Sequence, residues 1–258
     1  MIEGIKEFMY FIPFLMEIIK RDFKKKYYKS ILGVAWSMLN PLLMMIVITI
    51  VFSTLFKREI EFYPIYWLSG NLIFMFIMDG TNSSLNSVIM NAGMITKMKI
   101  PKYFFCISTV TQHFITLLLS LIPYYLVAMV IGVGMSWHSL LIILPLIQTY
   151  FFTLGAGMIL CAYGTMLRDL NYLYGVLRRL LMYVTPIFYP ISILPESVRF
   201  VFELNPIYVY ICLFRDLTMN HTMPTERMLI YGTVYAVLTF VLGMVTFKEK
   251  EDRFFLYI

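Results

Sequence analysis

The chain has 258 residues, of which 60% are hydrophobic and 14% are charged. An average soluble domain has about 45–50% apolar and about 25% charged residues, so a water-soluble core could not bury this much apolar surface. Lipid must therefore be part of the solvent. The composition also excludes disorder, and three cysteines among apolar residues are too few for a disulfide scaffold.

The first predicted element is an amphipathic helix over residues 4–28. Apolar side chains such as Phe8, Leu15 and Ile19 fall on one side of a 3.6-residue period, and basic residues such as Lys20 fall on another. A helix with this pattern lies in the membrane interface rather than crossing the bilayer. The alternative is a basic anchor that only fixes the membrane topology.

Six apolar runs follow, and they predict an all-α integral membrane protein in which residues 1–258 form a single transmembrane domain. A helix needs about 20 residues to cross a bilayer, and each run is close to that length or longer. The expected transmembrane helices are residues 34–56, 63–90, 103–132, 140–167, 172–189 and 228–247.

Lysine and arginine set the orientation of these spans. With six spans, sixteen of the 21 Lys and Arg residues fall on one side of the membrane and five on the other. The positive-inside rule then places both termini in the cytoplasm. Because the basic residues are spread over membrane-proximal loops, nucleic acid is not an expected partner.

One face of the second span is polar. At 100° per residue, four of its side chains lie within an arc of about 80°. They are Asn71, Asp79, Asn82 and Asn86. Polar groups at membrane depth are costly, so this face either lines a hydrophilic path or packs against polar groups of a neighbouring helix.

The loop at residues 91–101, between the second and third spans, is short and basic and carries apolar side chains such as Met98 and Ile100. A short helix there would suit the docking of another cytoplasmic protein. A plain positively charged loop is the alternative.

Three further patterns concern the later spans and the outer face. In the fourth span, small residues recur every four positions and predict close packing against another helix. They are Thr153, Gly157, Cys161 and Thr165. In the fifth span, Arg178 and Arg179 lie about two turns from the cytoplasmic end, where they either reach the lipid headgroups or form an anion site. Tyr63, Tyr66 and Trp67 start the second span, as an aromatic belt or as rings that stack on sugars.

Residues 192–218, between the fifth and sixth spans, are moderately apolar but are broken by Pro195 and Pro206. Each apolar piece is too short to cross the bilayer, so we predict re-entrant helices that dip into the outer leaflet. An ordinary extracellular loop is the alternative, although it would expose many apolar side chains.

Several common motifs are missing. No G-x-x-x-x-G-K-[ST] phosphate loop occurs, so the chain is not expected to bind ATP by that means. H-E-x-x-H and C-x-x-C are also missing, and no metal or cofactor is expected on this chain. Paired D-x-x-x-D motifs are absent as well, which argues against a membrane prenyltransferase.

Other motifs resemble the permease subunits of ABC exporters for polysaccharides, of the O-antigen, capsule and teichoic acid types. The residues that carry the resemblance are Tyr28-Lys29-Ser30-Ile31-Leu32-Gly33-Val34-Ala35-Trp36 with Asn40-Pro41, Arg168-Asp169-Leu170, Thr185-Pro186-Ile187-Phe188-Tyr189, Pro195 and Leu204-Asn205-Pro206. The similarity covers essentially the whole chain, and the first and last motifs together are fairly specific.

The resemblance implies a transport subunit rather than an enzyme. Its family exports undecaprenyl-diphosphate-linked polysaccharide from the cytoplasm across the bacterial inner membrane. The permease pairs with itself, and two copies of a separate cytoplasmic ABC ATPase bind the ATP and Mg. Residues 4–28 would be the interface helix, 91–101 the coupling helix and 192–218 the outer gate helices.

The resemblance also implies roles for individual residues. The substrate would enter, and its diphosphate would bind, at Ser30, Leu32, Gly33, Trp36, Arg178 and Arg179. The channel would be lined by Asn71, Asp79, Asn82, Asn86, Tyr63, Tyr66 and Trp67. The ATPase would couple through Met94, Lys97, Met98, Lys99 and Ile100. The alternatives are a drug- or lipid-exporting ABC permease and, from another class, a membrane enzyme that acts on lipid-linked sugars.

Overall fold

A computed structural model describes residues 2–28, 30–56, 60–97 and 100–256. Every regular element in these ranges is helical, which confirms the all-α prediction. The α-helices are α1 (Ile2–Tyr27), α2 (Ala35–Phe56), α3 (Tyr63–Leu85), α4 (Ser87–Met90), α5 (Ala92–Ile95), α6 (Tyr103–Ile131), α7 (Ile143–Gly164), α8 (Leu170–Val184), α9 (Glu196–Glu203), α10 (Pro206–Thr218) and α11 (Glu226–Lys250). Three 3-10 helices are η1 (Trp137–Ile142), η2 (Ile191–Ile193) and η3 (Glu251–Leu256).

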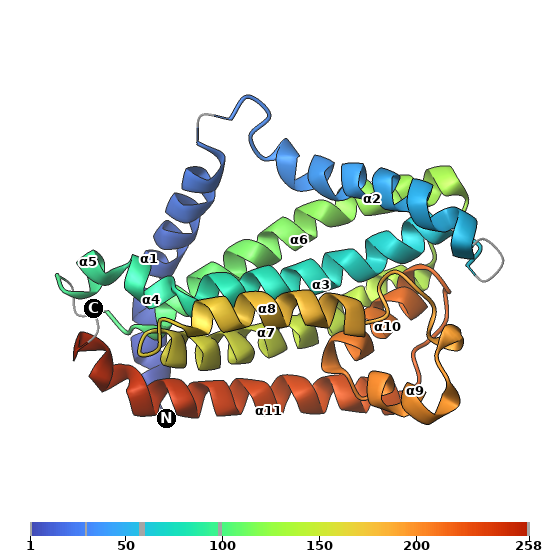
Figure 1. The fold of residues 1–258 in the computed structure, drawn as a ribbon. Coiled ribbons are helices and arrows are strands. Elements are labelled where there is room, and N and C mark those ends of the chain that lie inside the picture. The colour runs from blue at the N-terminus through green and yellow to red at the C-terminus, as the bar shows by residue number, and fades with distance from the viewer. Residues whose placement is uncertain (1, 29, 57–59, 98–99, 257–258) are drawn as a thin grey trace.

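Helices α3, α7, α8 and α11 run side by side along the length of the bundle, α2 and α6 are inclined to them, and α1 crosses the bundle steeply (Figure 1). One end of the bundle holds α4, α5, the start of α1 and the end of α11, and we call it the α4–α5 end. The opposite end holds α9 and α10, and we call it the α9–α10 end. The two ends of the described chain therefore lie on the same side of the bundle (Figure 1).

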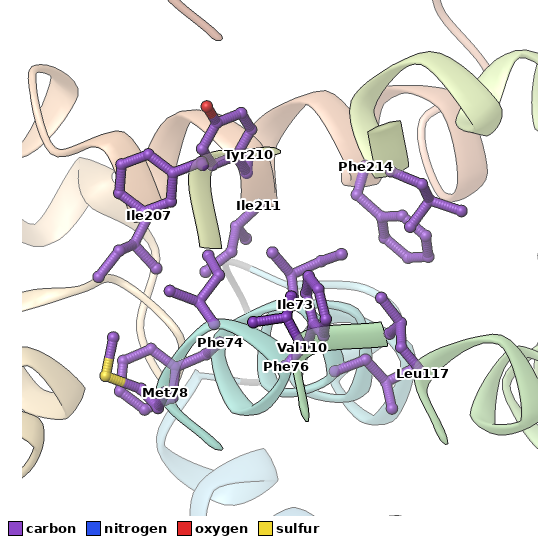
Figure 2. Packing of buried hydrophobic residues seen from close by; sticks show 14 of the residues in the cluster. Ile73, Phe74, Phe76, Met78, Val110, Leu117, Ile207, Tyr210, Ile211 and Phe214 are labelled. Carbon is purple, nitrogen blue, oxygen red and sulfur yellow. The ribbon is translucent and has the colours of Figure 1, made fainter. Parts of the chain in front are cut away.

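Helix α3 is the centre of the bundle. Sixteen of its 23 residues are buried. Its apolar side chains pack against α6 on one side and α10 on another, as Figure 2 shows for Phe74 and Phe76 of α3 beside Val110 of α6 and Ile211 of α10. Helices α2, α8 and α11 lie outside this core, and many of their apolar side chains are exposed, as expected for surfaces that face lipid or another protein.

Small residues let α7 approach α3 closely. A Cβ added to Gly157 of α7 would lie 2.8 Å from Ser84 Oγ of α3, and one added to Gly80 of α3 would lie 2.8 Å from Thr153 Cγ2. Cys161 is fully buried, with its Sγ 3.4 Å from Ser87 Oγ of α4. These contacts confirm that the four-residue repeat of small side chains in α7 serves packing.

Four helical stretches are long and apolar enough to cross a membrane, or up to five if the bent pair of α9 and α10 counts as one span. The four are Ala35–Phe52, Tyr103–Ile131, Trp137–Gly164 and Glu226–Phe254. The two helices of the bent pair meet at 87°. These spans, found among the described residues, make the chain a multi-pass membrane protein.

Two helices end earlier than the hydropathy predicts. The predicted span 172–189 corresponds to α8, which has 15 residues and ends at Val184. The reason is local: Pro186 disfavours helical backbone at Thr185, which is extended with ψ of 128°. The predicted span 63–90 is interrupted at Asn86, where the backbone leaves the helical region before α4 begins.

Arg215 of α10 is buried and ties three segments together at the α9–α10 end. Its Nε donates to Ser69 Oγ (3.2 Å) and its Nη2 to the Tyr66 carbonyl (3.0 Å), both in α3. Its Nη1 and Nη2 also donate to the carbonyls of Pro186 (3.2 Å) and Ile187 (3.3 Å), in the segment that follows α8. The guanidinium lies 3.6 Å from the centroid of the Tyr66 ring. A buried charge needs this many partners to offset its loss of hydration.

We expect Arg215→Lys to lower the free energy of unfolding by about 2 kcal/mol or more, because an ammonium has three donors and no planar fork, so at least one buried acceptor loses its partner. Thermal melting of the purified protein in detergent measures the change. Arg227→Lys is the matched control, since Arg227 is exposed and its Nε donates to the Tyr231 hydroxyl of its own helix. Equal melting temperatures for the two variants would contradict this role for Arg215.

Candidate functional site

A cavity of about 610 Å³ lies between α2, α3, α6 and α8, and the last turn of α1 reaches it. Its polar lining consists of Lys26, Ser37, Asn40, Asn71, Asp79, His113, Thr116, Ser120, Arg178 and Arg179. Three of these residues are Lys or Arg, and Asp79 is the one acidic residue among the side chains that line the cavity, all of which lie in the described part of the chain. The cavity therefore carries a formal excess of two positive charges.

The turn before α2 positions one wall of the cavity. The Gly33 backbone N–H donates to Ser30 Oγ (3.1 Å), and Gly33 adopts a left-handed φ of +47°, which favours glycine. The N–H groups of Ala35 and Trp36 then donate to the carbonyls of Leu32 (2.9 Å) and Gly33 (3.3 Å) and begin α2. The S-x-L-G motif thus forms the turn that places Trp36 at the cavity.

A proline in α2 explains a contact between two walls. Pro41 has no N–H, so the carbonyl of Ser37, four residues earlier, loses its helical donor. Ser120 Oγ of α6 donates to that carbonyl at 3.0 Å. The contact joins α2 to α6 at the edge of the cavity, which all three residues line.

Three polar contacts join α3 and the segment after it to α8. Arg178 Nη2 lies 2.5 Å from Asp79 Oδ1, and the Tyr174 and Thr81 hydroxyls are 2.5 Å apart. Asn86 Nδ2 donates to Asn171 Oδ1 at 2.6 Å. We call these contacts the polar seam. On α8 its residues are spaced by three and then four positions, which places them on one helix face.

The polar seam adds to a small apolar contact of α8 with the rest of this chain, in which partly buried Leu181 and Met182 pack against the core. Of the residues of α8, all of which the structure describes, only Tyr174 is buried. Apolar side chains on its other faces are exposed, among them Leu173, Leu177 and Leu180. Polar contacts between helices contribute about 1–2 kcal/mol in model peptides in membranes, so the seam holds α8 without a large apolar interface.

The cavity brings together six of the residues that the sequence analysis assigned to the substrate site or the channel lining. They are Trp36, Trp67, Asn71, Asp79, Arg178 and Arg179. Asp79 of the polar face of α3 lines the cavity and also packs against a polar group of α8. Asn86 joins only the seam, beside a second pocket of about 380 Å³, and Asn82 is half-buried and lines neither pocket.

Other predicted site residues lie elsewhere. The hydroxyls of Tyr63 and Tyr66 donate to the carbonyls of Phe188 (3.0 Å) and Tyr189 (2.9 Å), so the structure places these rings against the segment after α8 rather than in the cavity. Ser30, Leu32 and Gly33 act through the turn described above and do not line the cavity.

The predicted coupling residues lie at the α4–α5 end. Lys97 is exposed, and Met94 Sδ lies 2.7 Å from Nη1 of Arg21 on α1. Arg21 Nη2 also donates to Asn91 Oδ1 at 2.9 Å. Ile100 is buried and packs with α1 and α6 rather than presenting an apolar surface. Met98 and Lys99 lie outside the described residues.

Sequence reasoning missed two contributors. Lys26 was counted only as part of a basic anchor, because nothing in a single sequence shows that α1 crosses the bundle and ends at the cavity. Tyr174 was missed although a signal existed: it lies four residues before Arg178, on the same helix face.

Comparison with known proteins agrees with this architecture. Residues 14–219 match the family model of the ABC-2 type transporter. The O-antigen export system permease protein RfbA of Myxococcus xanthus is 26% identical over 257 residues, which cover 98% of each chain. A protein of the same name from Klebsiella pneumoniae is 28% identical over 249 residues, 95% of each chain. The polysialic acid transport protein KpsM of Escherichia coli is 18% identical over 239 residues, 90% of this chain and 91% of its own.

The family match covers most of the chain, and the helices long and apolar enough to cross a membrane fit a permease. The chain belongs to the ABC-2 type transporter family.

Proposed function

We propose that the chain is the membrane-spanning subunit of an ATP-driven exporter that moves undecaprenyl-diphosphate-linked polysaccharide from the cytoplasm across the bacterial inner membrane. The observation that carries the proposal is the cationic cavity, where Lys26, Arg178 and Arg179 accompany a single carboxylate. Arg pairs strongly with phosphate oxygens. The proposed class of polymer comes from the names of the relatives, which mention O-antigen in one case and polysialic acid in another.

The cavity is one half of the proposed path. Leu43 and Val47 of α2 and Leu177 and Leu180 of α8 are exposed on the helices that flank it. A second copy of the chain would cover such faces and close the cavity into a channel, so the proposed state is a homodimer with six spans in each subunit, α2, α3, α6, α7, α8 and α11.

The α4–α5 end is the proposed docking site for the ATPase. The chain has no phosphate loop, so the ATP and Mg would be held by two copies of a separate cytoplasmic subunit. Exposed Lys97 and half-buried Met94 present charge and apolar surface at this end. In this orientation both termini are cytoplasmic, and α9 with α10 would form the outer gate.

The charged lining of the cavity also argues against the two alternative functions, a drug-exporting permease and a membrane enzyme. A permease for hydrophobic drugs has no need for a cavity lined by three cations and one carboxylate, because charged groups within a membrane protein are costly. An enzyme acting on lipid-linked sugars would need acid–base or metal-binding groups placed together, and the groups that meet in this cavity form an ion pair instead.

Export itself provides the test of this function. Removing this gene from the bacterium that carries it should leave lipid-linked polymer on the cytoplasmic side, and the intact gene should restore the polymer at the surface. The double variant Arg178→Gln, Arg179→Gln should lower the export rate about tenfold or more, because each charged hydrogen bond contributes about 1.5–3 kcal/mol. Surface polymer is quantified with the amount of membrane-inserted protein as the reference. Normal export by an inserted double variant would contradict the assignment of the head-group site.

Docking of the ATPase gives a separate prediction. We expect Lys97→Glu to reduce co-purification of the ATPase subunit, because the substitution reverses an exposed charge at the α4–α5 end. Arg227→Glu makes the same charge change at the start of α11, at the α9–α10 end, and should leave co-purification intact (Figure 1). Equal retention of the ATPase by both variants would place the docking surface elsewhere.

A further inference from the structure

We propose that the Asp79–Arg178 ion pair is an exchangeable closure: the diphosphate of the lipid carrier replaces the Asp79 carboxylate on Arg178 and so loosens α8 from α3. The inference rests on the proposed function and adds how the substrate itself opens the site. The ligand class is a diphosphate ester of a long-chain lipid.

The ion pair is accessible to such a ligand. The side chains of Arg178 and Asp79 are 28% and 37% exposed, and both residues line the cavity. A single nitrogen of the guanidinium makes the ion-pair contact, whereas a guanidinium has five N–H donors in a planar fork. A phosphate group can engage that fork through two parallel hydrogen bonds. The arrangement therefore permits exchange from the cavity side.

The charges favour the exchange. An isolated cation at membrane depth is costly, so Arg178 needs an anion at every stage. A diphosphate carries more negative charge than one carboxylate, and it would be attracted by Lys26 and Arg179 as well, which line the same cavity. The released Asp79 carboxylate stays in a cavity that Lys26 and Arg179 also line. Arg178 thus keeps an anionic partner throughout the exchange.

The consequence for α8 follows from its weak attachment. The polar seam has three contacts, and Arg178 makes the one that faces the cavity. Exchange at Arg178 leaves the contacts of Tyr174 and Asn171, which lie toward the start of α8. Leu181 and Met182 still pack against the core, and Arg215 still holds the segment after Val184. The middle of α8, around Arg178, can then shift away from α3 and widen the cavity.

A binding cycle tests the exchange. The probe is farnesyl diphosphate, and farnesol is the control for the lipid chain. Binding is measured to the full-length chain in nanodiscs as wild type, Asp79→Asn, Arg178→Gln and the double variant. We expect Asp79→Asn to bind the probe about tenfold more tightly than wild type, because the competing carboxylate is gone. In the Arg178→Gln background, Asp79→Asn should change the affinity by no more than about twofold.

The outcomes separate the two proposals. An equal gain from Asp79→Asn in both backgrounds means that Asp79 acts only through the total charge of the cavity, and this overturns the exchange while the diphosphate site stands. A wild-type chain that melts normally but binds no farnesyl diphosphate overturns the head-group site of the proposed function itself.

A distance measurement covers the case in which Arg178→Gln does not fold. Spin labels are attached at Ile122→Cys on α6 and Leu177→Cys on α8, both at exposed positions, in a chain whose Arg178 and Asp79 are intact. We expect the distance between the labels to lengthen when farnesyl diphosphate binds and to stay unchanged with farnesol. A bound probe with no change in the distance overturns the release of α8.

Discussion

Polar side chains inside a membrane protein must find partners within the protein, and α3 organises this structure around that constraint. Its Asp79, Thr81 and the neighbouring Asn86 meet Arg178, Tyr174 and Asn171, and these three contacts join α8 to α3. In water the same groups would be hydrated and would hold two helices only weakly. Lipid offers these groups no hydrogen-bond partners, so they must bind to one another. The cavity is the exception, because a ligand or water there can compete for their hydrogen bonds. The stability of the α3–α8 contact therefore depends on what fills the cavity.

Arg215 and Arg178 differ in burial, and this difference separates a permanent contact from one that a ligand can exchange. Arg215 is 5% exposed and is held by four neutral acceptors and one aromatic ring. No incoming anion can reach it without breaking the packing at the α9–α10 end. Arg178 has a partly exposed side chain and its ion-pair contact is with one charged partner that lines a cavity. The same residue type thus fixes one end of α3 and leaves its middle responsive to ligand.

Hydropathy alone predicted the helical class, and the spacing of small residues predicted that α7 packs closely against another helix, which the structure identifies as α3. The end of α8 was also within reach, because Thr185 precedes Pro186. Other features depend on tertiary structure. The predicted polar arc of α3 is wide enough to face two neighbours, so the sequence could not separate Asp79, at the cavity, from Asn86, at the seam. Nor could it place Lys26 in the cavity, because the direction of α1 is set by its packing on α6.

That packing also places two residues near the end of α1 beside different parts of the molecule. Arg21 contacts Asn91 and Met94 beside α5, whereas Lys26 lines the cavity. The two residues are five positions apart, about 7.5 Å along a helix at about 1.5 Å per residue. A helix is stiff over so short a distance, so a displacement of α5 that carries Arg21 must also move Lys26. Motion at the α4–α5 end therefore changes the position of Lys26, one of the three cations that line the cavity with Asp79. This change alters how well a competing anion can replace the Asp79 carboxylate on Arg178.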